Sequence, residues 1–110
     1  MTYRNRDLLG VVHDLSCVHC GKFGVQASHA NLSIFGKGGA HKASDAAIMA
    51  LCPKCHYELD QGKTMTKAQR WDFQMECIAK TLVQLLEHGL LEVAKPKKLK
   101  FGEFSNGSCL

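Results

Sequence analysis

Apolar residues recur every three or four positions in the second half of the chain, which is the spacing of an amphipathic helix. They are Ala68, Trp71, Met75, Ile78, Leu82 and Leu85. Thr66 and Gln69 fit a capping box, in which both side chains bond free backbone N–H groups of the first turn. Gly89 follows the last turn, where helices commonly end. The pattern predicts a helix over 66–88 whose apolar stripe packs on the rest of the fold.

Shorter patterns precede and follow this helix. They predict a helix over 4–16, strands over 25–29 and 48–51, a helix over 53–60, and a short extended piece over 90–93. A glycine-rich segment, 36–39, lies in the long loop between the two strands. Pro53 favours the first turn of its helix, and Gly62 marks the end.

Two Cys-x-x-Cys pairs, Cys17/Cys20 and Cys52/Cys55, are the strongest chemical signal. Thiolates bind zinc tetrahedrally, and a two-residue spacing lets both sulfurs of a pair reach one ion. The intervening segment, 21–51, is longer than the roughly 15–20 residues of a plain zinc ribbon. The two predicted strands account for this length by returning the chain to the same ion. The pairs therefore predict one structural Zn²⁺ held by four sulfurs.

Two further residues near this chemistry have simpler interpretations. His19 lies inside the first Cys-x-x-Cys pair, but four cysteines already complete the tetrahedron, so we expect a bystander. Cys77 on the long helix has no second cysteine nearby, which predicts a small buried hydrophobic side chain.

Length and composition restrict the class of protein. A chain of 110 residues suits one small domain, whose modest core a structural zinc would supplement. The hydrophobic content of 45% is ordinary, and no apolar run approaches the roughly 18 residues that span a bilayer. The charged N-terminus lacks the apolar core of a secretory signal, so we expect a cytoplasmic protein without disulfides. The net charge of +4 mildly favours a polyanionic partner.

The end of the chain is predicted to differ from the rest. Residues 1–94 form the zinc-containing domain, and 95–110 form a basic, flexible tail. The lysines of the tail can contact phosphates or remain solvated, and the pattern does not choose between these. The predicted helix over 66–88 is roughly 35 Å long, more than so small a core can bury, which leaves surface for a homodimer.

His56 and Asp60 stand four residues apart on the predicted helix over 53–60 and so share a face. An imidazole and a carboxylate one turn apart can hold one divalent ion between them. Spacing alone favours a solvated His–Asp pair on a surface turn. The motif that surrounds the pair favours the metal site instead.

The arrangement Cys17-x-x-Cys20, Ser28-His29 and Cys52-Pro-Lys-Cys55-His56 resembles the HNH, or ββα-metal, nucleases that carry a structural zinc beside the active site. Segments 28–30, 36–39, 44–45 and 51–60 resemble more narrowly the prophage-encoded YbcO-like nucleases, with a looser likeness to the phage recombination nuclease Ref. The likeness covers about residues 7–95. It implies an α+β fold in which a long C-terminal helix packs on a small zinc-stabilised ββα-metal module.

The resemblance also implies an activity, that of a metal-dependent DNA endonuclease. His29 matches the general base that takes a proton from the attacking water. His56 matches a ligand of the catalytic Mg²⁺ or Mn²⁺, and Asp60 matches a position that supplies a further ligand in several relatives. The ion would polarise the scissile phosphate, and hydrolysis would leave a 5′-phosphate and a 3′-hydroxyl. The implied setting is phage or prophage DNA recombination or processing, with recombination proteins as further partners.

Two positions depart from the pattern of the resemblance. Ser28 stands where other members carry a metal-binding Asp or His, and Ala47 stands where an Asn is usual. Asp45, two residues before Ala47, is our candidate for orienting His29, with Asn31 as the second choice.

The loop between the predicted strands suits a nucleic-acid backbone. Lys37 and Lys42 can bind phosphates, and the glycines between them allow close approach of the main chain. His41 can add a phosphate contact or a metal ligand, or can simply be solvated.

Two other interpretations compete with the nuclease. The departures at Ser28 and Ala47 favour a non-catalytic, zinc-stabilised module that binds DNA or another protein. A purely structural zinc ribbon in a larger recombination assembly is the third interpretation. It predicts that loss of His56 changes nothing, whereas loss of Cys52 unfolds the domain.

Overall fold

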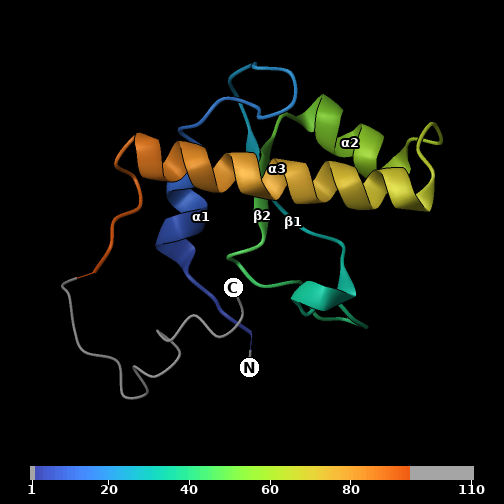
Figure 1. Cartoon of the computed structure of the whole chain (residues 1–110), viewed down its shortest axis with the longest axis horizontal. Coiled ribbons are helices and arrows are strands. Elements are labelled where there is room, and N and C mark those ends of the chain that lie inside the picture. The colour runs from blue at the N-terminus through green and yellow to red at the C-terminus, as the bar shows by residue number, and fades with distance from the viewer. Residues whose placement is uncertain (1, 95–110) are drawn as a thin grey trace, which may run out of the picture.

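A two-stranded antiparallel sheet lies at the centre of the fold, with helices packed around it (Figure 1). The computed structural model describes residues 2–94. Its elements are α1 (Arg6–Val12), β1 (Gln26–His29), the 3-10 turn η1 (Ser33–Phe35), β2 (Ile48–Leu51), α2 (Pro53–Gln61) and α3 (Lys67–Glu87). The predicted α+β class is confirmed. The predicted tail, 95–110, lies outside the described residues.

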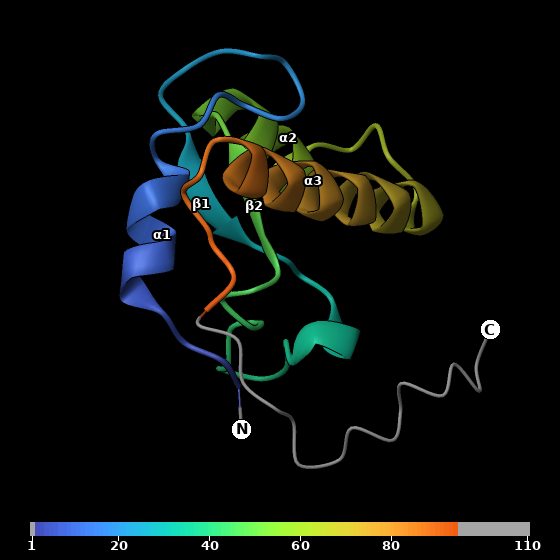
Figure 2. The ribbon, with the colours of Figure 1, turned by 60° about the vertical axis from the view of Figure 1, so that its left-hand side comes forward.

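The sheet register places the start of β1 beside the start of α2. Gln26 pairs with Leu51 and His29 pairs with Ile48. Cys52 follows β2 directly and is the N-cap of α2. The helix therefore begins at the end of the sheet where β1 begins. Figure 2 shows this from the side, with α1 against β1 and α3 crossing β2.

Three predicted boundaries need correction. The helix predicted over 4–16 is shorter, since α1 runs only over Arg6–Val12. The Asn5 side chain accepts the Leu8 N–H at 3.0 Å and is the N-cap, so the helix starts after Asn5. Strand β1 begins at Gln26, one residue later than predicted. The extended piece predicted over 90–93 is instead the cap of α3, where the N–H groups of Leu90 and Leu91 both donate to the Leu85 carbonyl.

Helix α2 ends where its sequence predicts. Gly62 is its C-cap, and the Gly62 N–H donates to the Glu58 carbonyl at 3.1 Å. A Cβ atom at position 62 would collide with that same carbonyl oxygen. Glycine is required here for close approach of the backbone rather than for a positive φ angle.

Helix α3 has the predicted capping box, with both the Thr66 and Gln69 side chains bonded to backbone N–H groups. Its buried face, however, only partly follows the predicted apolar stripe, of which Leu85 is buried and Ile78 packs against the core. The buried residues are Gln74, Cys77, Thr81 and Leu85. Trp71, Met75 and Leu82 of the predicted stripe are 41%, 36% and 48% exposed. These three side chains leave apolar surface on α3, and a homodimer through this helix stays a prediction.

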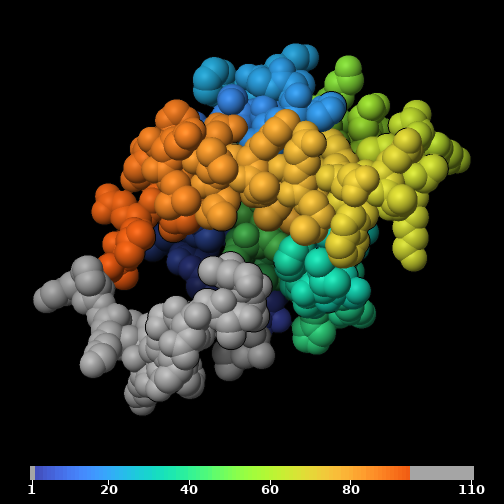
Figure 3. Space-filling model, in the orientation of Figure 1, coloured from blue at the N-terminus to red at the C-terminus, as the bar shows by residue number. Residues whose placement is uncertain are grey.

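Hydrogen bonds explain why α3 buries polar residues. The Thr81 hydroxyl accepts the Ala50 N–H of β2 at 3.0 Å and donates to the Cys77 carbonyl at 2.8 Å. The Gln74 side chain accepts the Asn31 N–H at 2.7 Å. Backbone groups that the short sheet leaves unpaired are thus satisfied by α3, which lies across one face of the molecule (Figure 3).

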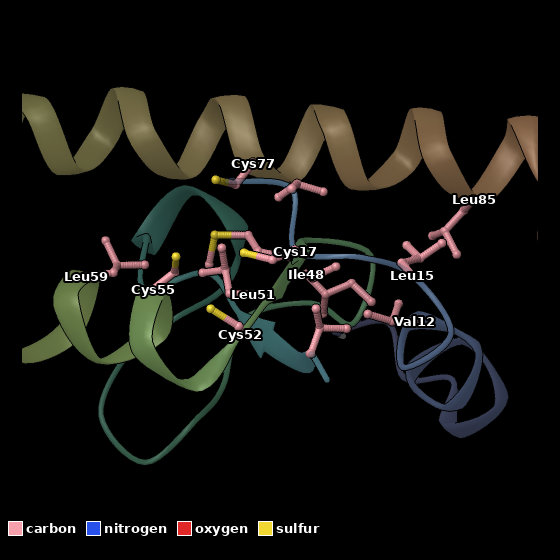
Figure 4. Close-up of a cluster of buried hydrophobic side chains, with 14 residues drawn as sticks. Val12, Leu15, Cys17, Ile48, Leu51, Cys52, Cys55, Leu59, Cys77 and Leu85 are labelled. Carbon is pink, nitrogen blue, oxygen red and sulfur yellow. The ribbon is translucent and has the colours of Figure 1, made fainter. Parts of the chain in front are cut away.

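The main hydrophobic core joins α1, β2, α2 and α3 (Figure 4). All four residues of β2 are buried, because elements cover both faces of this strand. Cys77 is 2% exposed and points into the core from α3, as predicted for a small buried hydrophobic residue. Within residues 2–94, no helix has the length and apolar character that crossing a bilayer demands.

Candidate functional site

The two Cys-x-x-Cys pairs meet as predicted. The sulfurs of Cys17, Cys20, Cys52 and Cys55 all lie within 4.8 Å of one another. Cys20 is exposed and the other three are buried. A tetrahedron with zinc–sulfur bonds of about 2.3 Å has edges of about 3.8 Å, and the Cys20 and Cys52 sulfurs are 3.5 Å apart. The group therefore fits a structural metal ion such as zinc.

The backbone around the first pair holds its sulfurs in place. The Cys17 N–H donates to the Lys22 carbonyl at 2.7 Å, and the Gly21 N–H donates to the Cys17 carbonyl at 2.8 Å. Gly21 has a φ of 83°, a conformation that L side chains rarely adopt. The Val18 N–H donates to the Ala50 carbonyl at 3.0 Å, which ties this turn to β2.

The thiols of the group differ in acidity. Burial acts to raise the pKa of Cys17, but backbone N–H groups at Cys20, Cys52 and His19 outweigh it and lower the pKa to about 6. A backbone N–H at Cys55 lowers the pKa of Cys52. Burial and the neighbouring thiols raise the pKa of Cys55. The lowered pKa values of Cys17 and Cys52 favour the thiolate form, which is the form that binds a metal cation.

His19 is closer to this centre than a bystander would be. Its Nδ1 lies 3.3 Å from the Cys55 sulfur, and its ring meets Phe73 edge-on with centroids 4.9 Å apart. His19 is not part of the four-sulfur group, so it contacts one ligand of the centre without replacing any.

A second polar cluster surrounds Asp45. His29 Nε2 lies 2.7 Å from Asp45 Oδ1, with the two side chains 17% and 5% exposed. The Asn5 N–H donates to Asp45 Oδ2 at 2.7 Å, and Arg4 Nη1 donates to Oδ1 at 3.1 Å. Burial acts to raise the pKa of Asp45, but the bonds from His29, Asn5 and Arg4 hold it below its usual value. Asp45, rather than Asn31, is the residue in contact with His29.

Sequence reasoning missed Arg4. Its guanidinium also donates to the carbonyls of Ala43, at 2.6 Å, and Lys42, at 2.9 Å, so it fastens the end of the β1–β2 loop. Arg4 and Asp45 are 41 residues apart, and no local pattern links them. Asn5 did carry a signal, because Asn before an apolar periodic run is a common helix N-cap.

His56 and Asp60 lie side by side on α2, as their spacing predicts. His56 Nε2 and Asp60 Oδ2 are 2.9 Å apart, and the side chains are 33% and 42% exposed. Neighbouring ligands of an octahedral ion with bonds of about 2.1 Å lie about 3.0 Å apart. The pair fits two adjacent ligands of Mg²⁺ or Mn²⁺. His56 Nδ1 lies 2.8 Å from Oε1 of Gln26, a contact that sequence reasoning also missed.

An open cavity of about 360 Å³ connects several of these groups. His29 of β1 and Asp60 of α2 both line it. The remaining lining residues are Ala30, Asn31, Lys37, Lys42 and Gln61. His41 is exposed in the same loop and is not among them. The structure thus brings His29, Asp60 and the two predicted loop lysines to one place.

The two positions that depart from the resembled pattern, Ser28 and Ala47, are both buried. The Ser28 hydroxyl is buried and has no hydrogen-bond partner within residues 2–94. Ala47 is 4% exposed and packs with Ala30 and Ala43 in a cluster of small side chains. Its carbonyl accepts the Ala30 N–H at 2.9 Å. A larger amide side chain would have to displace this cluster.

Comparisons with protein-family models, with curated proteins and with solved structures find no match. The resemblance to HNH nucleases therefore stays a prediction. What the structure itself provides is a four-sulfur group suited to zinc, a His29–Asp45 pair whose histidine lines a cavity, and a second His–Asp pair on α2.

Proposed function

We propose that this chain is a metal-dependent DNA endonuclease of the HNH type. The observation that carries the proposal is the cavity lined by both His29 and Asp60, with Lys37 and Lys42 on its wall. It combines a candidate base, a candidate cation ligand and phosphate-binding side chains in one place. The hairpin that carries His29 lies between the two cysteine pairs, and the helix that carries Asp60 begins at the second pair.

His29 is the proposed general base. The Asp45 carboxylate has only acceptor atoms, so the ring nitrogen that faces it, Nε2, carries the proton of a neutral imidazole. Nδ1 is then left with a lone pair that can accept a proton from water. Asp45 acts as an orienting residue, since it holds the ring and its protonation pattern without touching the substrate.

His56 and Asp60 are the proposed ligands of Mg²⁺ or Mn²⁺. Such an ion supplies Lewis-acid stabilisation of the scissile phosphate and the leaving oxygen. Lys37 and Lys42 bind neighbouring phosphates and position the strand without reading its sequence. The structural zinc holds the first turn of α2 against the Cys17–Cys20 turn, which keeps the ligand pair beside β1.

Plasmid nicking by the purified zinc-loaded protein tests the proposal. We expect cleavage that requires Mg²⁺ or Mn²⁺ and falls about 100-fold or more in His29→Ala. His13→Ala is the matched control, because His13 is an exposed histidine that bonds only the Leu9 carbonyl. Equal cleavage by His29→Ala and wild type would remove His29 as the base. Resealing of the nicks by DNA ligase checks for the expected 5′-phosphate and 3′-hydroxyl.

A non-catalytic DNA-binding or protein-interaction module is the second candidate. The buried, unpartnered Ser28 hydroxyl favours it, because this position supplies a metal ligand in other HNH members. A crystal soaked in Mn²⁺ separates the two. An ion bound at His56 and Asp60 favours the nuclease, whereas DNA binding without such an ion favours the module.

A further inference from the structure

Gln26, the first residue of β1, reaches across to the imidazole of His56 on α2. We infer that Gln26 is a positioning residue, which holds the His56 ring in the orientation that a divalent cation needs. The inference rests on the proposed function, since it takes His56 and Asp60 as the ligand pair. It adds a role for a residue that no motif in the sequence indicates.

Both ring nitrogens of His56 face acceptor oxygens. Nδ1 lies 2.8 Å from Gln26 Oε1, and Nε2 lies 2.9 Å from Asp60 Oδ2. An amide oxygen can only accept a hydrogen bond, so Nδ1 donates to Gln26. A cation bound between Nε2 and Oδ2 would take the place of a proton there, and the Nδ1–H bond to Gln26 would hold the ring in that orientation.

The second ligand lies beside Nε2. Nε2 and Asp60 Oδ2 are 2.9 Å apart, which is the spacing of adjacent ligands of an octahedral cation. Both side chains are about one-third or more exposed, which leaves the pair open to a cation from solvent. One imidazole and one carboxylate suit a hard ion of the Mg²⁺ or Mn²⁺ class.

The fold explains why Gln26 can do this. Gln26 is the register partner of Leu51, and α2 starts two residues after Leu51. The His56 N–H donates to the Cys52 carbonyl at 2.9 Å, so the helix fixes the backbone of His56. Gln26 then fixes its ring from the neighbouring strand. Backbone and side chain of the proposed ligand are thus held by two different elements.

The first readout is the His56 tautomer in the full, zinc-loaded chain, with Mg²⁺ at the lowest concentration that saturates the wild type. Long-range ¹H–¹⁵N correlation spectra at pH 8 report which ring nitrogen bears the proton. We expect Nδ1–H in wild type and in Gln26→Glu, whose carboxylate still accepts the bond. In Gln26→Leu we expect loss of this preference. Gln84→Leu on α3 is the matched control and should resemble wild type.

The second readout is Mn²⁺ affinity, followed by the electron paramagnetic resonance signal of free Mn²⁺. We expect Gln26→Leu to bind 10- to 100-fold more weakly, the usual effect of losing a partner that orients a metal ligand. Gln26→Glu should bind at least as tightly as wild type. Asp60→Ala should lose binding, which assigns the signal to this pair. Zinc content and circular dichroism confirm that each variant is folded.

Three results would overturn the inference. They are Nε2–H in the Mg²⁺-saturated wild type, unchanged Mn²⁺ affinity in Gln26→Leu, and a wild-type chain that binds no Mn²⁺. A different result separates the inference from the proposed function. If Gln26→Leu loses tautomer preference and Mn²⁺ affinity while the wild type cleaves no DNA, Gln26 keeps its positioning role and the endonuclease proposal falls.

Discussion

The imidazole of His29 and the carboxylate of Asp45 share a 2.7 Å contact between Nε2 and Oδ1, although the residues are 16 positions apart. The same carboxylate also receives the Arg4 guanidinium and the Asn5 N–H. One buried side chain thus joins β1, the loop before β2 and the segment before α1. Asp45 is therefore important for stability as well as for the orientation of His29.

Replacing Asp45 tests this network. In Asp45→Asn, an amide replaces a buried carboxylate whose donors include a guanidinium. We expect the free energy of unfolding at pH 7 to fall by about 2 kcal/mol, the scale of hydrogen bonds to a charged group. Urea unfolding in buffer with excess zinc measures it. Asn31→Ala is the control, since within residues 2–94 the Asn31 side chain makes no hydrogen bond to His29. An equal loss in both variants would contradict the prediction.

The effect of Asp45 should also depend on pH. Its pKa is lower in the folded chain than in the unfolded one, because donors from His29, Asn5 and Arg4 outweigh the effect of burial. Such a group stabilises the fold fully above its unfolded pKa, roughly 4, and loses this effect as the pH falls toward the folded pKa. The difference between wild type and Asp45→Asn should stay constant from about pH 7 to 5 and shrink below about 4. A difference that widens on acidification would refute this.

Loss of one cysteine of the four-sulfur group should remove both the metal and the fold. We expect Cys52→Ser to bind no zinc and to lose its cooperative unfolding transition, because a domain this small depends on its metal. Cys77→Ala removes a buried thiol outside the group and should keep one zinc, at a cost of about 1 kcal/mol. Colorimetric assays measure the zinc content, and circular dichroism measures the unfolding transition. A folded, cooperative Cys52→Ser protein would show that the metal is dispensable.

The loop lysines should act through charge alone. We expect Lys37→Ala and Lys42→Ala each to weaken DNA binding similarly for every sequence and to lower the slope of log K against log salt by about 1. Fluorescence anisotropy over a salt series measures both. Lys80→Ala is the control, because Lys80 pairs with Glu76 at 2.8 Å on α3. A sequence-dependent loss would instead indicate base recognition.

The contact between α3 and β2 should depend on one hydroxyl. Thr81 is 1% exposed and accepts the Ala50 N–H. Thr81→Val keeps the shape but leaves that buried N–H unpaired, so we expect a loss of about 1–3 kcal/mol. Thr81→Ser keeps the hydroxyl and should lose less. Urea unfolding compares them, and equal stability of the valine variant would show that packing alone holds α3.

The local features of this fold could be predicted from sequence because each depends on neighbours along the chain. The capping box of Thr66 and Gln69 joins residues three apart, and α2 starts at Pro53 and is capped at Gly62 as expected. The spacing within each Cys-x-x-Cys pair likewise predicted a group of four sulfurs. The continuous apolar run over 48–51 was enough to place β2.

The sequence by itself determined the order and type of the main elements and the cysteine group, since short-range hydrogen bonding and ligand spacing decide these. Only the tertiary structure decided which face of α3 is buried, because Thr81 and Gln74 on that face bond backbone N–H groups of distant segments. It also decided the partners of Asp45 and His56. Arg4 and Gln26 reach them across 41 and 30 positions, a proximity that depends on sheet register and helix docking rather than on any local pattern.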